Sequence, residues 1–330
     1  MLAACSSSAT GTSTLSPTPG PTQLVDPSSP TSASAAPSGS ATPTPRPSIP
    51  ASNNLDGITV VGDFGKLPQV KIPAPWAVTT SQSKVIQPGN GPEIAKTSTV
   101  EIHYWGANGR TGEVFDESFS GGKPIALPLE GFIPGFVNGL VGQKSGSRVL
   151  IGITGPDGYG PNGGNPQAGI EADDCIVFVV DILAVSLTQP AGTPVTPAAG
   201  LPTVTGDVAK PQVTIPAGAT PPTSLVVQPL IKGAGREVAP TDVVQVNYAE
   251  YAWSNGQLVK QTYGYKPLEG PLAQTLPAWQ EGLAKQTVGS RVLIVAPPAK
   301  SYPSGNPRIG VKPGETMVYV VDILFASTSG

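Results

Sequence analysis

Aromatic residues recur between residues 100 and 160 at the ends of expected strands and turns, and one carboxylate, that of Asp116, directly follows one of them. Four segments carry this pattern: Val100–Tyr104, Gly112–Ser118, Gly131–Phe136 and Gly155–Gly160. No nucleophile stands beside a base in them, so the spacing does not favour nucleophilic catalysis. Aromatic side chains around a few polar groups are typical of an apolar pocket that binds and orients a ligand.

The chain offers few residues for a metal or redox site. It has two cysteines and one histidine, which are too few for a zinc site. Cys175 lies inside an apolar strand pattern, so we expect a small buried side chain and not a reactive thiol. Glu171, Asp173 and Asp174 form an acidic run, for which a solvated loop is favoured over a metal site. We expect no metal and no cofactor.

His103 alternates with Ile102 and Tyr104 along an expected strand. Successive side chains of a strand point to opposite faces of the sheet. We therefore expect His103 to point away from the pocket and to lie on the surface.

Composition excludes some classes of function. Charged residues make up 12% of the chain and the net charge is −3. The sequence therefore lacks the excess of basic residues that indicates nucleic-acid binding, and we expect no nucleic-acid partner. Glycine (40 residues) and proline (39 residues) are frequent, which indicates that part of the chain is not packed core. The sequence has no run of about 18 apolar residues of the kind that a transmembrane helix needs.

The segment Leu2–Cys5 resembles a bacterial lipobox, in which a cysteine after small residues receives lipid. A complete signal has a charged region and an apolar run before the cysteine. Only four residues precede Cys5, so either the leader was trimmed or the start was assigned wrongly; the alternative is an incidental cluster. We expect 1–5 to be a signal remnant, lipidated Cys5 to anchor an exported protein at the outer face of the cell membrane, and 6–53 to be a disordered Ser/Thr/Pro/Ala tether.

Two copies of one pattern follow the tether. Three matches show the duplication: Val60–Lys66 with Val204–Lys210, Gly146–Ile151 with Gly289–Ile294, and Val179–Leu183 with Val320–Leu324. The offset drifts only from 144 to 141 residues, which is far too long for a solenoid repeat. We therefore expect a first unit at 54–187, a linker at 188–200 and a second unit at 201–330.

Each unit has mostly β signals. In the first unit, apolar or alternating runs predict strands at 100–105, 149–153 and 176–185. Asn-Gly pairs at 108–109 and 255–256 predict turns between strands. One short helix in each unit begins at Pro134 or Pro277, because proline suits the first helical position. The prediction is an α+β fold, an antiparallel sheet wrapped around one short helix.

The order of motifs in the first unit resembles the FKBP-type peptidyl-prolyl cis/trans isomerases, and the whole chain resembles a bacterial lipoprotein of actinobacterial type with two such domains in tandem. The motifs are Val-x-Ile-His-Tyr, Gly-x-x-Phe-Asp-x-Ser, Phe-Ile-Pro-Gly-Phe, Gly-Tyr-Gly and a final Val-Phe strand. The resemblance implies a pocket made of Tyr104, Phe115, Asp116, Phe132, Ile133, Phe136, Tyr159, Ile170 and Phe178. Phe136 stands where most members have tryptophan, and Asn165 replaces a histidine that is common after Gly-Tyr-Gly.

The reaction that this resemblance implies needs no bond-making group. Rotation about an X–Pro bond has to break amide resonance, so a catalyst needs to bind the twisted amide better than the planar one. We expect the Ile133 N–H and the Tyr159 hydroxyl to donate to substrate carbonyls. Asp116 would polarise the amide or hold Tyr104, and acid-base catalysis by this carboxylate is less favoured.

The second unit departs from the pattern. Its residues Tyr248, Trp279, Tyr302 and Tyr319 correspond to Tyr104, Phe136, Tyr159 and Phe178, but Val259 and Lys260 replace Phe115 and Asp116. Thr275-Leu276 replaces Phe132-Ile133. We predict a weak or inactive isomerase that still binds proline-containing chains.

Three functions stay open at this stage. The first is a prolyl isomerase for secreted or cell-envelope proteins, with its activity in the first unit. The second is a chaperone or binding module that holds proline-containing polypeptides without turnover, and the third is a structural spacer of the envelope. The resemblance also implies macrolide ligands, and we expect a monomer.

Overall fold

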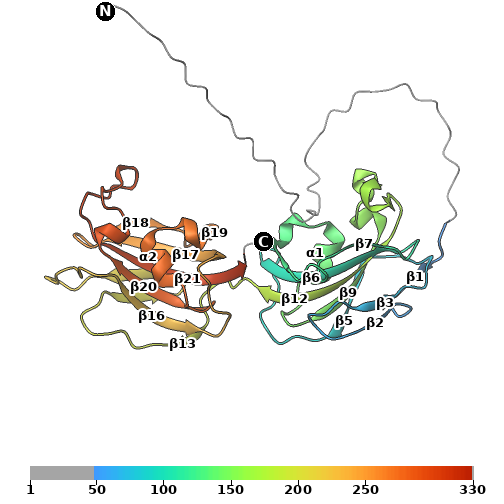
Figure 1. The fold of residues 1–330 in the computed structure, drawn as a ribbon, viewed down its shortest axis with the longest axis horizontal. Helices are drawn as coiled ribbons and strands as arrows, with labels where there is room; N and C mark the ends of the chain where they lie inside the picture. The colour runs from blue at the N-terminus through green and yellow to red at the C-terminus, as the bar shows by residue number, and fades with distance from the viewer. Residues whose placement is uncertain (1–47, 329–330) are drawn as a thin grey trace, which may run out of the picture. The chain divides into compact units, whose positions relative to one another are not determined.

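The computed structural model describes residues 48–328 of the 330-residue chain. The predicted lipobox, Cys5 and most of the predicted tether lie outside the described residues. The described chain forms two units of similar design, each an antiparallel sheet with one short helix on one face (Figure 1). This arrangement confirms the predicted α+β fold.

The sheet of the first unit has the strand order β5-β9-β12-β6-β7, and β8 also pairs with β6. Its strands are β5 (Gln82–Gln87), β6 (Thr99–Asn108), β7 (Val114–Glu117), β8 (Ile125–Pro128), β9 (Arg148–Ile153) and β12 (Ile176–Val185). The central strands β6 and β12 pair antiparallel from Ile176 opposite Asn108 to Val185 opposite Val100. The three strands predicted from the apolar runs are therefore confirmed.

Helix α1 (Pro134–Leu140) lies directly on β9 because two glycines leave room for the strand. A Cβ at Gly135 would lie 2.3 Å from Ile153 Cγ2, and one at Gly139 would lie 2.7 Å from Ile151 Cγ2. Phe136 and Leu140, on the buried side of the helix, join the core formed with the sheet. The predicted start at Pro134 is confirmed, and the position of the helix fixes one wall of the aromatic cluster described below.

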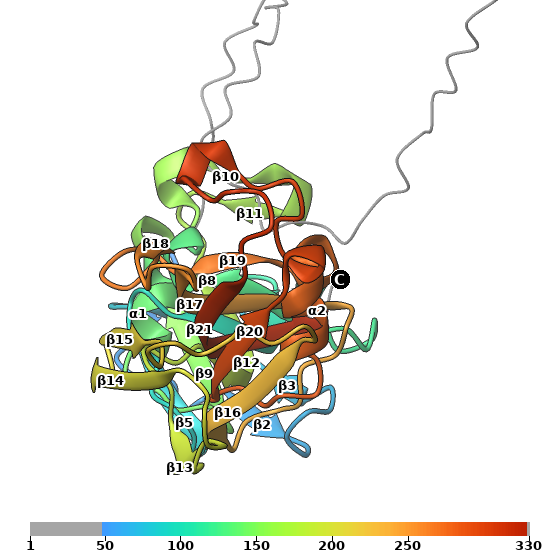
Figure 2. The same ribbon diagram turned by 90° about the vertical axis from the view of Figure 1, so that its left-hand side faces the viewer.

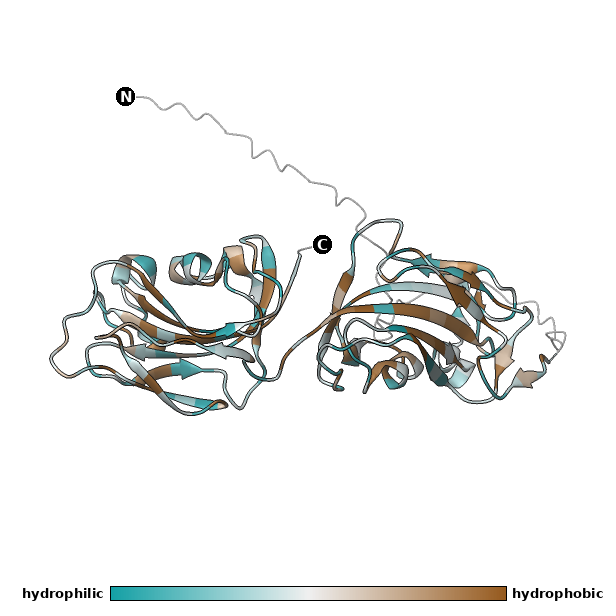
Figure 3. Ribbon diagram, turned by 90° about the horizontal axis from the view of Figure 1, so that it is seen from below, coloured by the Kyte–Doolittle hydropathy of each residue, from teal (hydrophilic) through white to brown (hydrophobic). Residues whose placement is uncertain are grey.

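The opposite face of the first sheet is covered by the segment 54–78, which we call the strap. It contains β2 (Thr59–Val61), β3 (Gln69–Lys71) and β4 (Ala77–Val78), and β4 pairs with β1 (Ala51–Ser52). Leu55, Ile58 and Trp76 of the strap are buried against Trp105 and Leu150 of the sheet. The central strands are therefore covered on both faces. Hydrophobic residues lie along these strands (Figure 3).

A buried ion pair fastens the strap to the sheet. Arg148 on β9 donates from Nε and Nη2 to the Asp181 carboxylate on β12 at 2.6 and 2.7 Å, and both side chains are at most 1% exposed. The same guanidinium donates to the carbonyls of Gly62 and Lys66, and Asp181 accepts the Gly65 N–H at 2.6 Å. The Arg148–Asp181 bonds join β9 to β12, and the other three bonds connect the sheet to one turn of the strap.

The residues that follow β7 overturn one prediction. His103 does point away from Tyr104, but it is only 8% exposed, so its predicted place on the surface is wrong. Its ring stacks on Phe119 at 4.8 Å, and its Nδ1 lies 3.0 Å from Ser118 Oγ. The face that would be solvated in a single-layer sheet is covered here, and burial lowers the pKa of His103.

The second unit repeats the design. Its sheet order is β13-β16-β20-β21-β17-β18, with β19 paired to β17, and Figure 2 shows β16, β20, β21 and β17 side by side. The strands are β13 (Gly192–Pro194), β16 (Val226–Gly233), β17 (Asp242–Ala252), β18 (Leu258–Gln261), β19 (Leu268–Pro271), β20 (Arg291–Ala296) and β21 (Met317–Thr328). Helix α2 (Pro277–Leu283) covers one face, and the hairpin of β14 (Thr203–Asp207) and β15 (Lys210–Thr214) contributes to the core on the other.

Two short strands lie where the sequence predicts tether and linker. β13 falls inside the predicted 188–200 linker and pairs with the edge strand β16, and β1 falls at the end of the predicted tether. Gly192 allows the approach, because a Cβ there would lie 2.0 Å from the Lys232 carbonyl oxygen. Backbone pairing at a sheet edge does not need apolar side chains, so these strands leave no periodic signal.

Replacing Asp181 by asparagine (Asp181→Asn) should destabilise the first unit by about 3 kcal/mol, since it leaves the buried Arg148 guanidinium without its counter-charge. This loss of stability is measured by hydrogen exchange, in which the amides of β9 and β12 should exchange faster. The matched control is Lys84→Gln at the exposed Lys84–Asp56 pair, whose side chains are 51% and 67% exposed. That change should cost less than about 1 kcal/mol. Equal effects of the two substitutions would contradict a structural role for the buried pair.

Candidate functional site

The nine residues predicted for the pocket come together on the helix-covered face of the first sheet. Four are buried in the core cluster, namely Tyr104, Phe136, Ile170 and Phe178. Four more pack against it while partly exposed, namely Phe115, Phe132, Ile133 and Tyr159. Asp116 joins them through Tyr104, to which it is hydrogen-bonded. A half-exposed aromatic cluster therefore lies where the resemblance places the pocket.

Phe178 on β12 is the centre of the aromatic cluster. The rings of Phe115 and Phe136 meet it edge to face at 5.6 and 5.1 Å, and the Tyr104 ring lies 6.3 Å away. Phe132 stacks on Phe136 at 4.7 Å, so the cluster extends to the residues before α1. Such contacts between rings stabilise the cluster beyond the burial of the rings themselves, and they fix the orientations of the rings.

Gly106 keeps the middle of this cluster free of a side chain. The strand register places it between Phe178 on β12 and Asp116 on β7. A Cβ at this position would lie 2.8 Å from atoms of both Phe115 and Phe178. The rings can approach one another over β6 only because residue 106 is glycine.

Asp116 orients a tyrosine at the edge of the cluster. The Tyr104 hydroxyl donates to Asp116 Oδ2 at 2.6 Å. Burial, and then this hydrogen bond, raise the pKa of Tyr104; burial also raises the pKa of Tyr159, with the Asp116 charge adding to it. Both phenols consequently keep their protons at neutral pH and remain hydrogen-bond donors. The prediction that Asp116 holds Tyr104 is confirmed.

An amide donor lies beside the rings at the start of α1. Ile133 has an extended backbone, and its carbonyl accepts the N–H groups of Phe136 and Val137. Within residues 48–328, the Ile133 N–H has no hydrogen-bond partner. Pro134, the next residue, has no N–H to compete. A donor that is free and adjacent to the cluster is available for a ligand.

The loop after Tyr159 closes the far side of the cluster. The short strands β10 (Gly164–Asn165) and β11 (Ile170–Glu171) form a two-stranded sheet in which Asn165 pairs with Ile170. Ile170 is 1% exposed and belongs to the core cluster. Asn165, which stands in place of the histidine expected from the resemblance, is half-buried on this hairpin.

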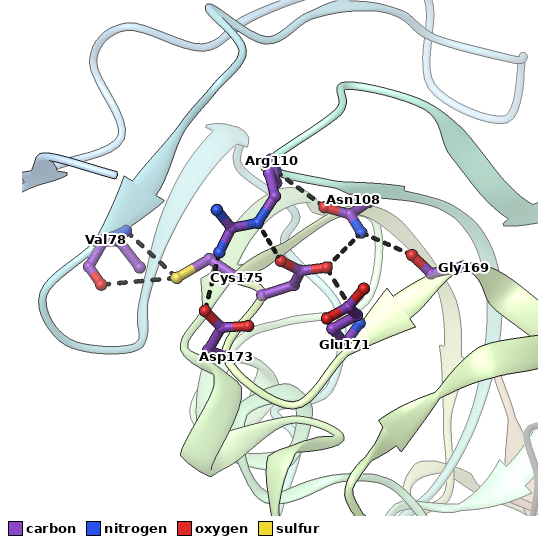
Figure 4. Close-up of polar contacts among 8 residues, drawn as sticks. Val78, Asn108, Arg110, Gly169, Glu171, Asp173 and Cys175 are labelled. Carbon is purple, nitrogen blue, oxygen red and sulfur yellow. Dashed lines mark hydrogen bonds and ion pairs between the residues drawn. The ribbon is translucent and has the colours of Figure 1, made fainter. Parts of the chain in front are cut away.

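The acidic run before β12 is not wholly solvated, in contrast to the prediction. Asp174 is 2% exposed and accepts hydrogen bonds from Asn108 Nδ2 at 2.9 Å, from the Arg110 guanidinium and from the Glu171 N–H at 3.0 Å (Figure 4). Although burial raises the pKa of Asp174, the bonds from Arg110 and Asn108 bring it below its usual value. The carboxylate thus ties the end of β6 to the start of β12.

Neighbouring Cys175 is buried, as predicted, and its sulfur accepts the Val78 N–H at 3.5 Å (Figure 4). Among residues 48–328 there is no group of three or more side chains suited to a metal ion.

The second unit has an aromatic cluster in the corresponding place. Trp279 on α2 meets the rings of Tyr248 and Tyr319 at 5.0 and 5.8 Å, and Tyr302 and Val259 pack against this core. Lys260 pairs with Glu250 across β17 and β18, as Asp116 pairs with Gly106 in the first unit. The predicted correspondence of Lys260 with Asp116 is therefore confirmed by strand register.

Sequence reasoning missed Glu250. It occupies the position of Gly106, between Tyr319 on β21 and Lys260 on β18, and it is 2% exposed. The signal was available, because Glu250 stands two residues after Tyr248 just as Gly106 stands two residues after Tyr104. A carboxylate thus lies where the first unit has no side chain.

Comparison with known proteins gives the family. A model of the FKBP-type peptidyl-prolyl cis-trans isomerases matches residues 91–183 and 234–324, together more than half of the chain. A probable FK506-binding protein of Corynebacterium glutamicum is 35% identical over 118 residues, which are 36% of this chain and 97% of that protein. The chain belongs to the FKBP-type peptidyl-prolyl cis-trans isomerase family, and each of its two units is one domain of that family.

Longer relatives are matched over only part of their length. A probable FKBP-type isomerase of Haemophilus influenzae is 34% identical over 113 residues, which are 33% of this chain and 46% of that protein. The crystal structure of FkpA from Escherichia coli is 32% identical, covers 31% of this chain and 46% of that chain, and has a TM-score of 0.29. The matched part is therefore about half the length of these relatives.

Replacing Gly106 by alanine (Gly106→Ala) should destabilise the first unit by about 1–3 kcal/mol, because the new methyl group would overlap Phe115 and Phe178. Chemical denaturation, monitored through hydrogen exchange of the β6 and β12 amides, measures this loss of stability. The control is Gly131→Ala, where a Cβ would meet nothing within 4 Å. If Gly106→Ala is tolerated as well as the control, the rings are not held as closely as the structure shows.

Proposed function

We propose that the first unit catalyses the cis/trans isomerisation of X–Pro bonds and that its substrates are exported or cell-envelope polypeptides. The observation that carries the proposal is the free Ile133 N–H beside the half-exposed cluster around Phe178. Membership of the isomerase family supports the reaction, and the isomerase name of the Haemophilus influenzae relative agrees with it.

The apolar surface favours the transition state of this reaction. Rotation passes through a twisted amide, in which resonance and the charge separation that accompanies it are lost. Water stabilises the planar, polar amide, whereas rings such as Phe115, Phe136 and Phe178 offer it no hydrogen bonds. Binding energy from the remainder of the peptide is then available for the twisted form.

Polar groups at the edge of the cluster orient the substrate. The Ile133 N–H donates to the carbonyl next to the proline, and the protonated Tyr159 hydroxyl donates to a second carbonyl. Asp116 holds the Tyr104 hydroxyl and adds negative charge near the rotating bond. No proton is transferred, so none of these groups has to change its protonation state during turnover. The same surface would accept macrolide ligands in place of the peptide.

The second unit is proposed to be a weak or inactive isomerase. The Glu250 side chain occupies the space that Gly106 leaves open, and Lys260 replaces the Asp116 carboxylate with a positive charge. The first change opposes an apolar, water-poor surface, and the second reverses the charge beside it. This preserved but altered site also supports the second candidate function, a binding or chaperone module without turnover.

Attachment to the membrane is proposed from the lipobox pattern at Leu2–Cys5 alone. None of the helices within residues 48–328 is long and apolar enough to cross a membrane. Mass spectrometry of the native protein tests the proposal, because a lipidated Cys5 adds the mass of its acyl chains. An N-terminal peptide of unmodified mass would overturn lipid anchoring without affecting the proposed isomerase.

The proposed reaction is tested by removing the Ile133 donor in the full chain. Ile133→Pro suits the observed φ of −60° and deletes the N–H, so we expect kcat/KM for a short X–Pro peptide to fall about tenfold or more. Ile133→Val keeps the N–H and should change kcat/KM less than threefold. Tyr159→Phe should lower it by up to about tenfold, while Tyr302→Phe in the second unit should have no effect.

Equal activity of Ile133→Pro and Ile133→Val would contradict the role of this amide. If the full chain binds the peptide but does not accelerate isomerisation, the binding or chaperone function replaces the enzymatic one.

A further inference from the structure

The second unit buries a carboxylate without satisfying it. Glu250 is 2% exposed, its Oε1 has no hydrogen-bond partner, and its Oε2 accepts only a long bond of 3.4 Å from the Tyr302 hydroxyl. A buried carboxylate oxygen without a donor costs more free energy than almost any other polar group. Within residues 48–328, only one other buried side-chain atom lacks a partner, the Trp279 Nε1 donor.

The two unsatisfied atoms belong to one aromatic cluster. Strand register puts Tyr319 beside Glu250, and Tyr248 lies two residues earlier on the same face of β17. Trp279 contacts the rings of both tyrosines. The cluster therefore brings together a buried anionic acceptor, a buried indole donor and three aromatic rings from β17, β21 and α2.

This combination matches a cation that is attached to a peptide. Aromatic faces attract ammonium and guanidinium groups, and a carboxylate provides the charged acceptor for their N–H donors. The Trp279 N–H needs an acceptor, which a backbone carbonyl of the same ligand supplies. We propose that the second unit binds polypeptides through a lysine or arginine side chain held by Glu250. This binding is independent of the isomerase activity proposed for the first unit.

The charges around Glu250 set the conditions for binding. Lys260 on β18 is exposed and is the cation across the register from Glu250, while Tyr248, Tyr302 and Tyr319 face it as neutral phenols. Burial raises the pKa of Glu250 to about 7, although Lys260 and the Tyr302 hydroxyl act to lower it. The carboxylate is thus protonated below pH 7 and ionised above it. Affinity for a cation should rise with pH across this range.

The first unit lacks the features of this site. Gly106 brings no side chain into the cluster, and the Asp116 carboxylate already accepts the Tyr104 hydroxyl. A neutral proline ring suits that apolar surface, whereas the unsatisfied, buried Glu250 carboxylate suits a basic side chain. The two units would then recognise different residues of a polypeptide.

Calorimetric titration of the full chain tests the proposal with blocked tripeptides that differ only at the central residue. We expect the arginine peptide to bind at least tenfold more tightly than the citrulline peptide, which has the same shape but no charge. Methylguanidinium alone should bind at least tenfold more weakly than the arginine peptide. The affinity for the arginine peptide should fall up to tenfold between pH 8 and pH 6.

Three variants locate the site. Glu250→Gln keeps the side-chain shape and should weaken arginine-peptide binding at least tenfold, and Lys260→Met should strengthen it severalfold by removing a like charge. The matched control is Glu281→Gln, which neutralises an exposed acid on α2 and should leave binding unchanged. Thermal unfolding of each variant checks that the second unit is folded.

Three results would overturn the proposal: equal affinity for the arginine and citrulline peptides, unchanged binding by folded Glu250→Gln, or weaker binding by Lys260→Met. Methylguanidinium binding as tightly as the arginine peptide would replace the polypeptide ligand by a free small cation.

Discussion

The steric contact at one position of the central strand sets the character of the aromatic cluster in each unit. At Gly106 the Phe115 and Phe178 rings come so close that even a methyl group would overlap them, and the result is a continuous apolar surface. In the second unit the same position holds Glu250, and the partner across the register changes from Asp116 to Lys260. One fold therefore has an open apolar position in one copy and a buried carboxylate in the other, because two positions paired across the strands differ.

A covered outer face keeps the central strands in place. In the first unit the Arg148–Asp181 pair bonds the strap to β9 and β12, and in the second unit Arg291–Asp322 is placed in the same way, with Arg291 donating to the Val208 carbonyl. The strap and the β14–β15 hairpin lie outside the regions that the family model matches. They add a second layer, so that β6, β9 and β12 are buried on both faces and the rings on the inner face rest on a stiff support.

The parts of the fold that could be predicted are those with a local signal. Alternating apolar residues and the position of Pro134 were enough for β6, β12 and α1. β13 could not be predicted, because it forms through backbone pairing at an edge. The burial of His103 and Asp174 depends on residues distant in the sequence, which single-strand patterns do not contain. The site residues of the first unit were predicted from motif order. Glu250 could have been found by aligning the two repeats, in which it takes the position of Gly106, but its burial depends on the strands on either side of it.

The most direct test of this account gives the first unit the residues of the second. In the full chain, Gly106→Glu combined with Phe115→Val should reduce kcat/KM for an X–Pro peptide at least a hundredfold, with hydrogen exchange showing that β6 and β12 remain folded. The reverse change in the second unit, Glu250→Gly, should not reduce the activity. If the double variant is folded and retains the activity of the unchanged chain, the isomerase activity proposed for the first unit does not depend on the open position at Gly106.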